Sequence, residues 1–311
     1  MWRLKRDSDE MTIEEWKKCL GELSDFVGRS IPLQFLGGEP LMKEGILDVV
    51  EFTSKKGYNT VLTTNAYLID EDMAKRIGDS GLTTINLSLH SLEEKIHDSI
   101  TGVKGSHSRV IKAIELLNRY GGNTSVGIDT LILDVNLGEL VKMVEWVNND
   151  KRLWRIFFLA CVQPFCSDSD SLWYRKKEHD GLWPKDLSKV HRVMDELIKL
   201  KEQRYKIDNP ISQLHLFNGY FKDPYGFIKN KAARKGNCPR GDAALEISPT
   251  GEISLCFYMG FFGSVRKDNI KDLWHSPAVS EIRNAINNCQ RECDLVVNCP
   301  YDVEDSVLDR G

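Results

Sequence analysis

Two periodicities of apolar residues alternate along the first half of the chain. Thr12 and Glu15 have the spacing of a capping box at a helix start. The apolar positions that follow recur at helical spacing, at Ile13, Trp16, Leu20, Leu23 and Phe26. The next apolar run, from Ile31 to Leu36, is short and ends in two glycines, as a buried parallel strand does. The pattern therefore predicts a helix followed by a strand.

The same pattern of helix and strand repeats along the chain. It predicts further helices over residues 43–56, 70–80, 106–120 and 137–149, and further strands over residues 58–63, 83–89, 125–133 and 153–159. Strands that alternate with helices form βαβ units. We therefore expect an α/β fold in which five strands build a parallel sheet or a partial barrel.

The periodicity changes beyond the fifth strand. Residues 161–185 predict a long loop or lid, residues 186–204 a helix, and residues 211–227 an irregular aromatic stretch. A basic and polar linker over residues 229–235 suggests a boundary between a domain of residues 1–230 and a smaller one of residues 236–311. The smaller part begins with the signature of a hairpin around Pro249-Thr250-Gly251, and two short helices are expected after it.

Composition and charge exclude some classes of function. The chain has 311 residues, of which 41% are hydrophobic and 28% charged, and its net charge is -4. Because the basic surplus of nucleic-acid-binding proteins is missing, we expect no nucleic acid as a partner. The N-terminus lacks the apolar run of a signal peptide, and no stretch approaches the roughly 20 apolar residues of a membrane span. We therefore expect a cytoplasmic protein that does not enter a membrane.

Five of the eight cysteines lie in the last quarter of the chain, at Cys238, Cys256, Cys289, Cys293 and Cys299. Clustered cysteines of a cytosolic protein are more often metal ligands or catalysts than disulfides. Thiolates at these spacings suit an iron–sulfur cluster or a structural zinc. Cys161 and Cys166 follow the fifth strand, where a thiol either faces a substrate or is buried as a structural residue.

Polar residues gather at three predicted strand ends. The first strand ends in Gly37-Gly38-Glu39-Pro40, where the glycines allow the backbone to approach a ligand and Glu39 can accept from an ammonium group. The next two strands end in Thr63-Thr64-Asn65 and in Ser88. The ends of parallel strands meet at one mouth of a barrel, so these residues predict a ligand site. A plain glycine turn before a helix is the alternative for the first segment.

These segments, in this order, make the chain resemble the radical SAM superfamily along essentially its whole length. The resemblance rests on residues 35–41, 62–66 and 85–90. It implies a partial (β/α)6 TIM-like barrel whose first strand is missing, with S-adenosyl-L-methionine (SAM) as a cofactor. By resemblance, Gly37, Gly38 and Glu39 bind the methionine amino group of SAM. Thr64, Asn65 and Ser88 contact the rest of the cofactor. Asp98 fits this family pattern but equally fits a surface position on a helix.

The N-terminal part of the sequence departs from the pattern of the family. The three cysteines that hold the cluster reducing SAM, spaced Cys-x3-Cys-x2-Cys, occur nowhere in the sequence, and Met1 stands about where the third of them is expected. A missing N-terminal segment is one account, and an inactive homologue is the other. A second four-iron four-sulfur cluster is therefore expected only if such a segment supplies its cysteines.

The tail resembles the SPASM or twitch domains that follow many radical SAM barrels. Cys238-x12-Gly251-x4-Cys256 matches the first half of their pattern, whereas Cys289-x3-Cys293-x5-Cys299 departs from the second half. By resemblance, four of these five cysteines hold one auxiliary four-iron four-sulfur (4Fe-4S) cluster. A zinc site is the alternative that the thiols leave open.

The resemblance implies a metal-binding oxidoreductase that uses SAM for radical modification of a substrate. Relatives with this tail often modify peptides or proteins, and some act on small molecules. An electron donor such as flavodoxin or ferredoxin is expected as a partner. A catalytically silent homologue that binds SAM and an auxiliary cluster, and a zinc-stabilised binding module, are the alternatives.

Overall fold

A computed structural model describes residues 9–24, 27–29, 31–163, 172–227, 238, 240–256, 258–289 and 295–298. Five parallel strands form one sheet in the order of the sequence, which is the α/β sheet of a TIM-like partial barrel. They are β1 (Leu33–Phe35), β2 (Thr60–Thr64), β3 (Thr84–Ser88), β4 (Ser125–Ile132) and β5 (Leu153–Ala160). All five predicted strands are therefore confirmed, with ends that differ by at most two residues.

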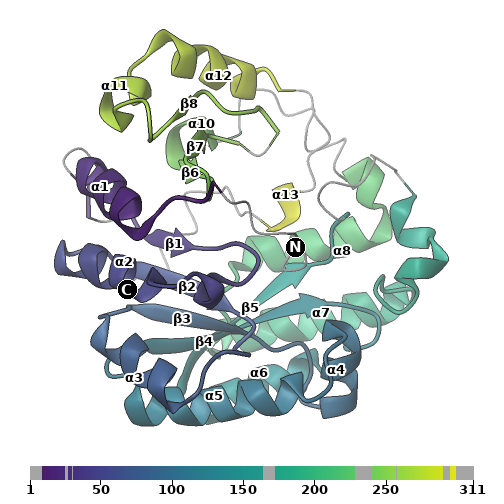
Figure 1. The fold of residues 1–311 in the computed structure, drawn as a ribbon. Helices are drawn as coiled ribbons and strands as arrows, with labels where there is room; N and C mark the ends of the chain where they lie inside the picture. Colours follow the sequence, from purple (N-terminus) through teal and green to yellow (C-terminus); the bar gives the residue numbers. More distant parts are fainter. Residues whose placement is uncertain are drawn as a thin grey trace.

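Helices connect the strands and cover one face of the sheet (Figure 1). They are α2 (Ile46–Lys55), α3 (Glu71–Asp79), α4 (Glu94–Thr101), α5 (Ser106–Tyr120), α6 (Leu140–Asn149) and α7 (Leu187–Glu202), and α1 (Ile13–Leu23) precedes the sheet. The capping box of Thr12 and Glu15 at the start of α1 is present. Five of the six helices predicted before residue 205 lie inside their predicted ranges, α5 matches its range, and α4 was not predicted.

The strand register separates two faces of the sheet. Leu62 lies beside Ile85 and Ile128 beside Ile156 in neighbouring strands, and these four fully buried side chains belong to the core shared with the helices. The residues between them point to the opposite face, where Thr63, Asn86, Gly127 and Arg155 form a row across β2 to β5. The helix-covered face is therefore apolar, and the other face carries polar groups.

The prediction of an irregular stretch over residues 211–227 was wrong, because α8 (Ile211–Lys222) occupies most of it. Leu214, Phe217 and Phe221 recur at helical spacing and are almost completely buried. Tyr220 is buried as well, on the same helix. Because apolar side chains lie on most of its circumference, the helix lacks the polar face by which a sequence pattern is recognised.

The predicted lid is described at residues 161–163 and 172–185. Two short turns occur there, η2 (Trp173–Arg175) and η3 (Lys177–His179). Trp183 is buried and packs against Phe221 with ring centroids 5.2 Å apart and against Trp173 at 5.6 Å. The described part of the lid therefore packs against α8 through these aromatic residues. Cys166 lies outside the described residues.

The tail contains the predicted hairpin and a third short strand. The antiparallel strands are β6 (Glu246–Ile247), β7 (Glu252–Ser254) and β8 (Gly263–Ser264), in that order. Gly251 has a φ of +95° in the turn between β6 and β7, a conformation that favours glycine. The tail helices are α10 (Arg240–Ala243), α11 (Ile270–Trp274), α12 (Pro277–Asn287) and α13 (Leu295–Asn298). The two short helices expected after the hairpin correspond to α11 and α12.

Helix α1 lies between the tail and the sheet (Figure 1). A second apolar core joins Leu20 of α1, Val49 of α2, and Ile253 and Ile270 of the tail. The backbone N–H of Met11 donates to the carbonyl of Pro249 at 2.7 Å. The hairpin is therefore held against the first helix by backbone and apolar contacts.

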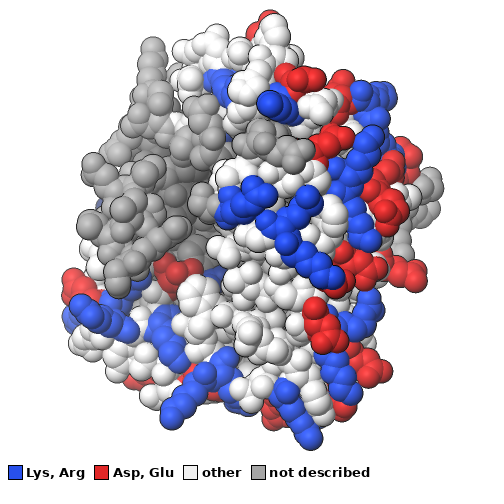
Figure 2. Space-filling view, turned by 90° about the vertical axis from the view of Figure 1, so that its left-hand side faces the viewer, with Lys and Arg blue, Asp and Glu red and all other residues white. Residues whose placement is uncertain are grey.

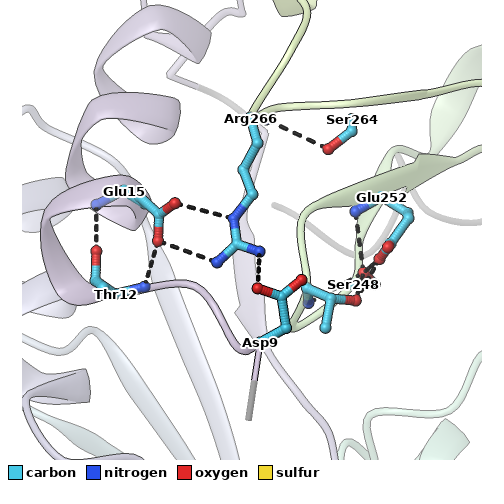
Figure 3. A network of polar contacts seen from close by, with 8 residues as sticks. Asp9, Thr12, Glu15, Ser248, Glu252, Ser264 and Arg266 are labelled. Atoms are coloured by element: carbon cyan, nitrogen blue, oxygen red, sulfur yellow. Dashed lines mark hydrogen bonds and ion pairs between the residues drawn. The ribbon is translucent and has the colours of Figure 1, made fainter. Parts of the chain in front are cut away.

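Arg266 adds charged contacts to this junction (Figure 3). Its guanidinium donates to Glu15 at 2.9 Å through Nε and pairs with Asp9 at 3.0 Å through Nη1. The hydrogen bond from Arg266 is the main reason why the pKa of Glu15 falls to about 2. The capping glutamate of α1 therefore also connects the helix to the tail.

Basic and acidic side chains are interspersed over the described part of the face shown in Figure 2. This agrees with the small net charge of -4. Among the described residues, no helix is both long and apolar enough to cross a membrane.

Candidate functional site

Glu39 connects the ends of the first two strands. Its carboxylate accepts a hydrogen bond from the Thr64 hydroxyl at 2.6 Å and from the Asn65 backbone N–H at 2.9 Å. The backbone N–H of Leu41 donates to the same carboxylate at 3.2 Å. A carboxylate offers about four lone pairs, so one acceptor position remains. The structure thus brings together the two segments that the sequence predicts to share a site.

The glycines before Glu39 follow the last residue of β1. Gly37 has a φ of +147°, and a Cβ built there would meet no atom within 4 Å. The backbone therefore needs glycine for its conformation and not for packing. Pro40 then begins a short turn, η1 (Pro40–Met42), which Glu39 caps. The segment is thus a bare stretch of backbone at the carboxyl end of the sheet.

Ser88 is the last residue of β3 and lies directly beside Asp129 of β4. Thr64 is buried, Asn65 is exposed and Ser88 is half-buried. The predicted contact residues therefore follow one another along the carboxyl ends of β1, β2 and β3.

Two residues close to these strand ends have structural contacts. The backbone N–H of His90 donates to Nδ1 of His97 at 3.1 Å, and Nδ1 of His90 accepts from the Leu131 N–H at 3.3 Å. Burial lowers the pKa of both histidines to about 4, so they are neutral at physiological pH. Asp98 accepts from the backbone N–H of His107 at 3.0 Å, which is the main reason why its pKa is lowered. Asp98 thus caps the start of α5.

Three of the five tail cysteines are described. Cys256 is buried in a small core with Leu255, Val279 and Ile286, and Cys238 packs against that core. Burial is the main cause that raises the pKa of Cys238, and the nearby thiols of Cys256 and Cys289 raise it further. Cys293 and Cys299 lie outside the described residues. Among the residues that are described, no three His, Cys, Asp or Glu side chains form a metal-binding group.

Cys161 follows β5 directly and has a protonated thiol at neutral pH. Burial raises its pKa to about 11, and its backbone carbonyl accepts from the Tyr220 hydroxyl at 2.9 Å. A thiol with such a pKa is a poor nucleophile. The environment therefore favours the buried structural residue over the substrate-facing one.

The open edge of β5 is paired mainly by side chains that sequence reasoning missed. The Asn209 carboxamide accepts from the N–H of Phe158 at 2.7 Å and donates to its carbonyl at 2.9 Å. Asn298 of α13 makes the corresponding two bonds to Ala160. Gln213 links them, since it accepts from Asn209 at 2.9 Å and donates to the carbonyl of Val297 at 3.1 Å. In the sequence, Asn298 appears only as the residue before Cys299, and no local pattern indicates that its side chain pairs with a strand.

The signature of the radical SAM superfamily matches residues 2–147, and that of the SPASM iron–sulfur cluster-binding domain matches residues 238–300. The first match includes the strand ends joined by Glu39, and the second includes all five tail cysteines. The chain is a radical SAM protein with a C-terminal SPASM domain. The predicted family is thereby confirmed.

Two sequence relatives illustrate how much of the chain is shared. An AdoMet-dependent heme synthase of Methanosarcina barkeri is 23% identical over 277 residues, which are 87% of this chain and 75% of that protein. A PqqA peptide cyclase of Bradyrhizobium diazoefficiens is 31% identical over 109 residues, which are 35% of this chain and 28% of that protein. The chain thus spans three quarters of the first relative and about a quarter of the second.

The fold also resembles that of a solved structure. Streptococcus suis SuiB bound to precursor peptide SuiA matches with a TM-score of 0.64 and 18% identity, over 95% of this chain and 67% of that one. The likeness therefore extends through both the barrel and the tail.

The residues of this radical SAM protein fit part of the cofactor set of the family. A radical SAM domain uses SAM with a 4Fe-4S cluster, and a SPASM domain holds an auxiliary cluster. Glu39 retains an acceptor for an ammonium group, and the tail supplies soft thiol ligands near one another. The sequence contains no Cys-x3-Cys-x2-Cys, so these residues do not fit the cluster that reduces SAM.

Proposed function

We propose that this protein is a radical SAM enzyme of the peptide-modifying type. The observation that carries the proposal is that Glu39 joins the Gly-Gly-Glu-Pro and Thr-Thr-Asn segments into one site at the carboxyl end of a parallel sheet. The PqqA peptide cyclase and the peptide-bound SuiB support a peptide or protein as the substrate. The heme synthase keeps a small molecule as the alternative.

In this proposal each strand end has a separate role toward SAM. The backbone of Gly37 and Gly38 approaches the methionine end, and Glu39 accepts from its ammonium group through the remaining lone pair. Thr64 keeps Glu39 in place, while Asn65 and Ser88 contact the rest of the cofactor. SAM supplies the 5'-deoxyadenosyl radical when it is reduced, and these residues orient it and limit side reactions.

The tail has a second role in the same proposal. Cys238 and Cys256, with two of Cys289, Cys293 and Cys299, hold one auxiliary 4Fe-4S cluster that binds substrate or carries an electron. The two domains are residues 1–230 and 236–311. A flavodoxin or ferredoxin supplies electrons, and the protein works in the cytoplasm.

SAM binding and SAM cleavage test this proposal separately. Calorimetric titration of anaerobically purified protein is expected to give SAM binding that Glu39→Ala weakens strongly. A chain carrying an added Cys-x3-Cys-x2-Cys segment before Met1 is expected to form 5'-deoxyadenosine with dithionite, and a graft with serines in place of the cysteines is the control. Co-expression with peptides encoded beside the gene, followed by mass spectrometry, tests the substrate class. Absence of SAM binding to the wild-type chain would overturn the assignment of the site.

A catalytically silent SAM-binding homologue is the second candidate. The observation that favours it is the absence of Cys-x3-Cys-x2-Cys from the sequence. It predicts that SAM binds but that the grafted chain forms no 5'-deoxyadenosine above the serine control. A zinc-stabilised module, in contrast, predicts stoichiometric zinc and no labile sulfide in protein purified without oxygen.

A further inference from the structure

The face of the sheet opposite the helices carries a buried polar group of residues beside the proposed SAM site. Asn86 of β3, Gly127 of β4 and Arg155 of β5 are neighbours in the register, and Asp129 lies beside Ser88. A Cβ at Gly127 would lie 2.8 Å from Asn86 Oδ1 and 3.2 Å from Arg155 Cγ. The missing side chain at this position therefore allows Asn86 and Arg155 to approach each other across β4.

Arg155 is the charged centre of this group. Its Nη1 lies 3.1 Å from Asp129 Oδ1, and its Nε lies 3.4 Å from Asp208 Oδ2. Arg155 is 8% exposed, and Asn86 is 4% exposed. Burial raises the pKa of Asp129, and the charge of Arg155 opposes this rise. A charged cluster on buried strands is costly unless its polar atoms are satisfied.

Asn86 Oδ1 has no hydrogen-bond partner, and Arg155 Nη1 and Asp129 Oδ1 have none besides their own ion pair at 3.1 Å. Asn86 Nδ2 faces the Thr63 hydroxyl at 3.5 Å, so the amide nitrogen of Asn86 already has a partner. Buried polar atoms without partners are rare and need an explanation. Here the acceptor Asn86 Oδ1 of β3 has no partner, and Arg155 Nη1 of β5 has only the ion pair with Asp129 of β4.

Solvent reaches the same face of the sheet from the side of β1 and β2. Gln34 lies beside Val61 in the register and is exposed, while Val61 and Thr63 are half-buried. On the opposite face Thr60, Leu62 and Thr64 are buried. The polar group thus lies next to an accessible part of the sheet and not within the helix-covered core.

We propose that Asn86 and Arg155 bind an amide group of the substrate, while the ion pair with Asp129 positions Arg155. The amide N–H donates to Asn86 Oδ1, and the amide carbonyl accepts from the second N–H of Arg155 Nη1. The inference rests on the proposed function, since it makes a peptide amide the group that is held beside Ser88 and SAM. The amide belongs either to the peptide backbone or to a glutamine or asparagine side chain. Arg155 acts here by binding and positioning, without a bond being made or broken.

Nuclear magnetic resonance of the arginine side chains tests the amide site without any SAM chemistry. Protein labelled with 15N at arginine is titrated with N-methylacetamide, which imitates a backbone amide, and with propionamide, which imitates a side-chain amide. The Nε signal of Arg155, assigned by its loss in Arg155→Lys, is expected to shift with one or both. Arg152 serves as the internal reference, since its guanidinium pairs with Asp150 at 2.6 Å. A larger shift with N-methylacetamide indicates a backbone amide, and a larger shift with propionamide indicates a side-chain amide.

The variant Asn86→Leu is expected to weaken amide binding by roughly five-fold, which corresponds to one neutral hydrogen bond. Asn86→Asp keeps the acceptor and is expected to retain binding, so loss of the fold and loss of the acceptor are distinguished. Equal shifts with propylamine or propionate would overturn the proposal, because they would show that only charge is recognised. No shift of Arg155 in a sample that binds SAM by calorimetry would overturn it while leaving the proposed function intact.

Discussion

The carboxamide of Asn298 pairs with the backbone of Ala160, although the two residues are 138 positions apart in the sequence. The N–H of Ala160 donates to Oδ1 at 2.7 Å, and Nδ2 donates to the carbonyl of Ala160 at 2.9 Å. An asparagine side chain thus takes the place of a neighbouring strand at the end of β5. This contact therefore fixes α13 next to the edge of the barrel.

We predict that Asn298→Ala lowers the free energy of unfolding by about 2 kcal/mol, since two partly buried hydrogen bonds to the backbone are lost. Urea denaturation of the two proteins measures the change. Asn149→Ala, at the exposed end of α6, is the control and is expected to change little. An Asn298→Ala protein as stable as the wild type would show that the tail is not anchored at this point.

We predict that the tail cysteines hold iron. Protein made without oxygen is expected to contain about four irons per chain, as one 4Fe-4S cluster requires, and Cys238→Ala or Cys256→Ala is expected to remove them. Cys19→Ala is the control, because Cys19 is buried in a separate core with α1. Iron and labile sulfide analysis measures the result, and stoichiometric zinc without sulfide would contradict it.

We predict that Gly37 is required for SAM binding. Gly37→Val places a side chain at a φ of +147°. The control Gly57→Val places one at a φ of +86° in the turn before β2, at the amino-terminal end of the strands and away from the proposed site. Backbone strain is expected to lower the stability of both variants by about 1 to 3 kcal/mol. Calorimetry is expected to show SAM affinity reduced roughly tenfold or more in Gly37→Val only. A similar loss in both variants would mean that Gly37 has no special contact with SAM.

We predict that the stability of the protein falls as the pH decreases from about 6.5 toward 4. His90 and His97 have a pKa of about 4 in the folded state because they are buried, whereas the unfolded chain binds their protons near pH 6.5. The stability that the two neutral histidines contribute is fully present above about pH 6.5. At pH 4, protonation of each histidine in the unfolded chain can lower the free energy of unfolding by up to about 3 kcal/mol. Urea denaturation at several pH values measures this loss.

The variant His97→Asn is expected to make this pH dependence shallower. An asparagine carbonyl can replace Nδ1 as the acceptor for the N–H of His90, but it does not titrate. His191→Asn, on the exposed surface of α7, is the matched control. An unchanged slope in His97→Asn would show that other groups determine the acid sensitivity.

We predict that Cys161 reacts slowly with iodoacetamide at pH 8 in the folded protein. Burial raises its pKa to about 11, so little thiolate is present, and Tyr220 holds the adjacent backbone. Peptide mass mapping compares its labelling with that of the same protein in urea, where the thiol is accessible. Equal rates in the two conditions would favour a solvent-facing thiol at the barrel mouth.

The sequence alone determined the strands and the family, because these depend on local periodicity and on short motifs. Parallel strands place their carboxyl ends at one edge, so the convergence of Glu39 with Thr64 and Asn65 followed from the pattern and is seen in the hydrogen bonds. The capping box of α1 and the turn glycine of the hairpin are equally local, and both are found as expected.

Tertiary structure decided which distant side chains meet. The sequence analysis singled out neither Arg155 nor Asp129, and their contact depends on the register of β4 with β5. Asn298 reaches Ala160 because α13 packs against β5 and α8. Helix α8 was not predicted because apolar side chains lie on most of its circumference, and Trp183 of the lid packs against its Phe221. Such pairings depend on the packing of whole elements, whereas a local pattern specifies only the elements themselves.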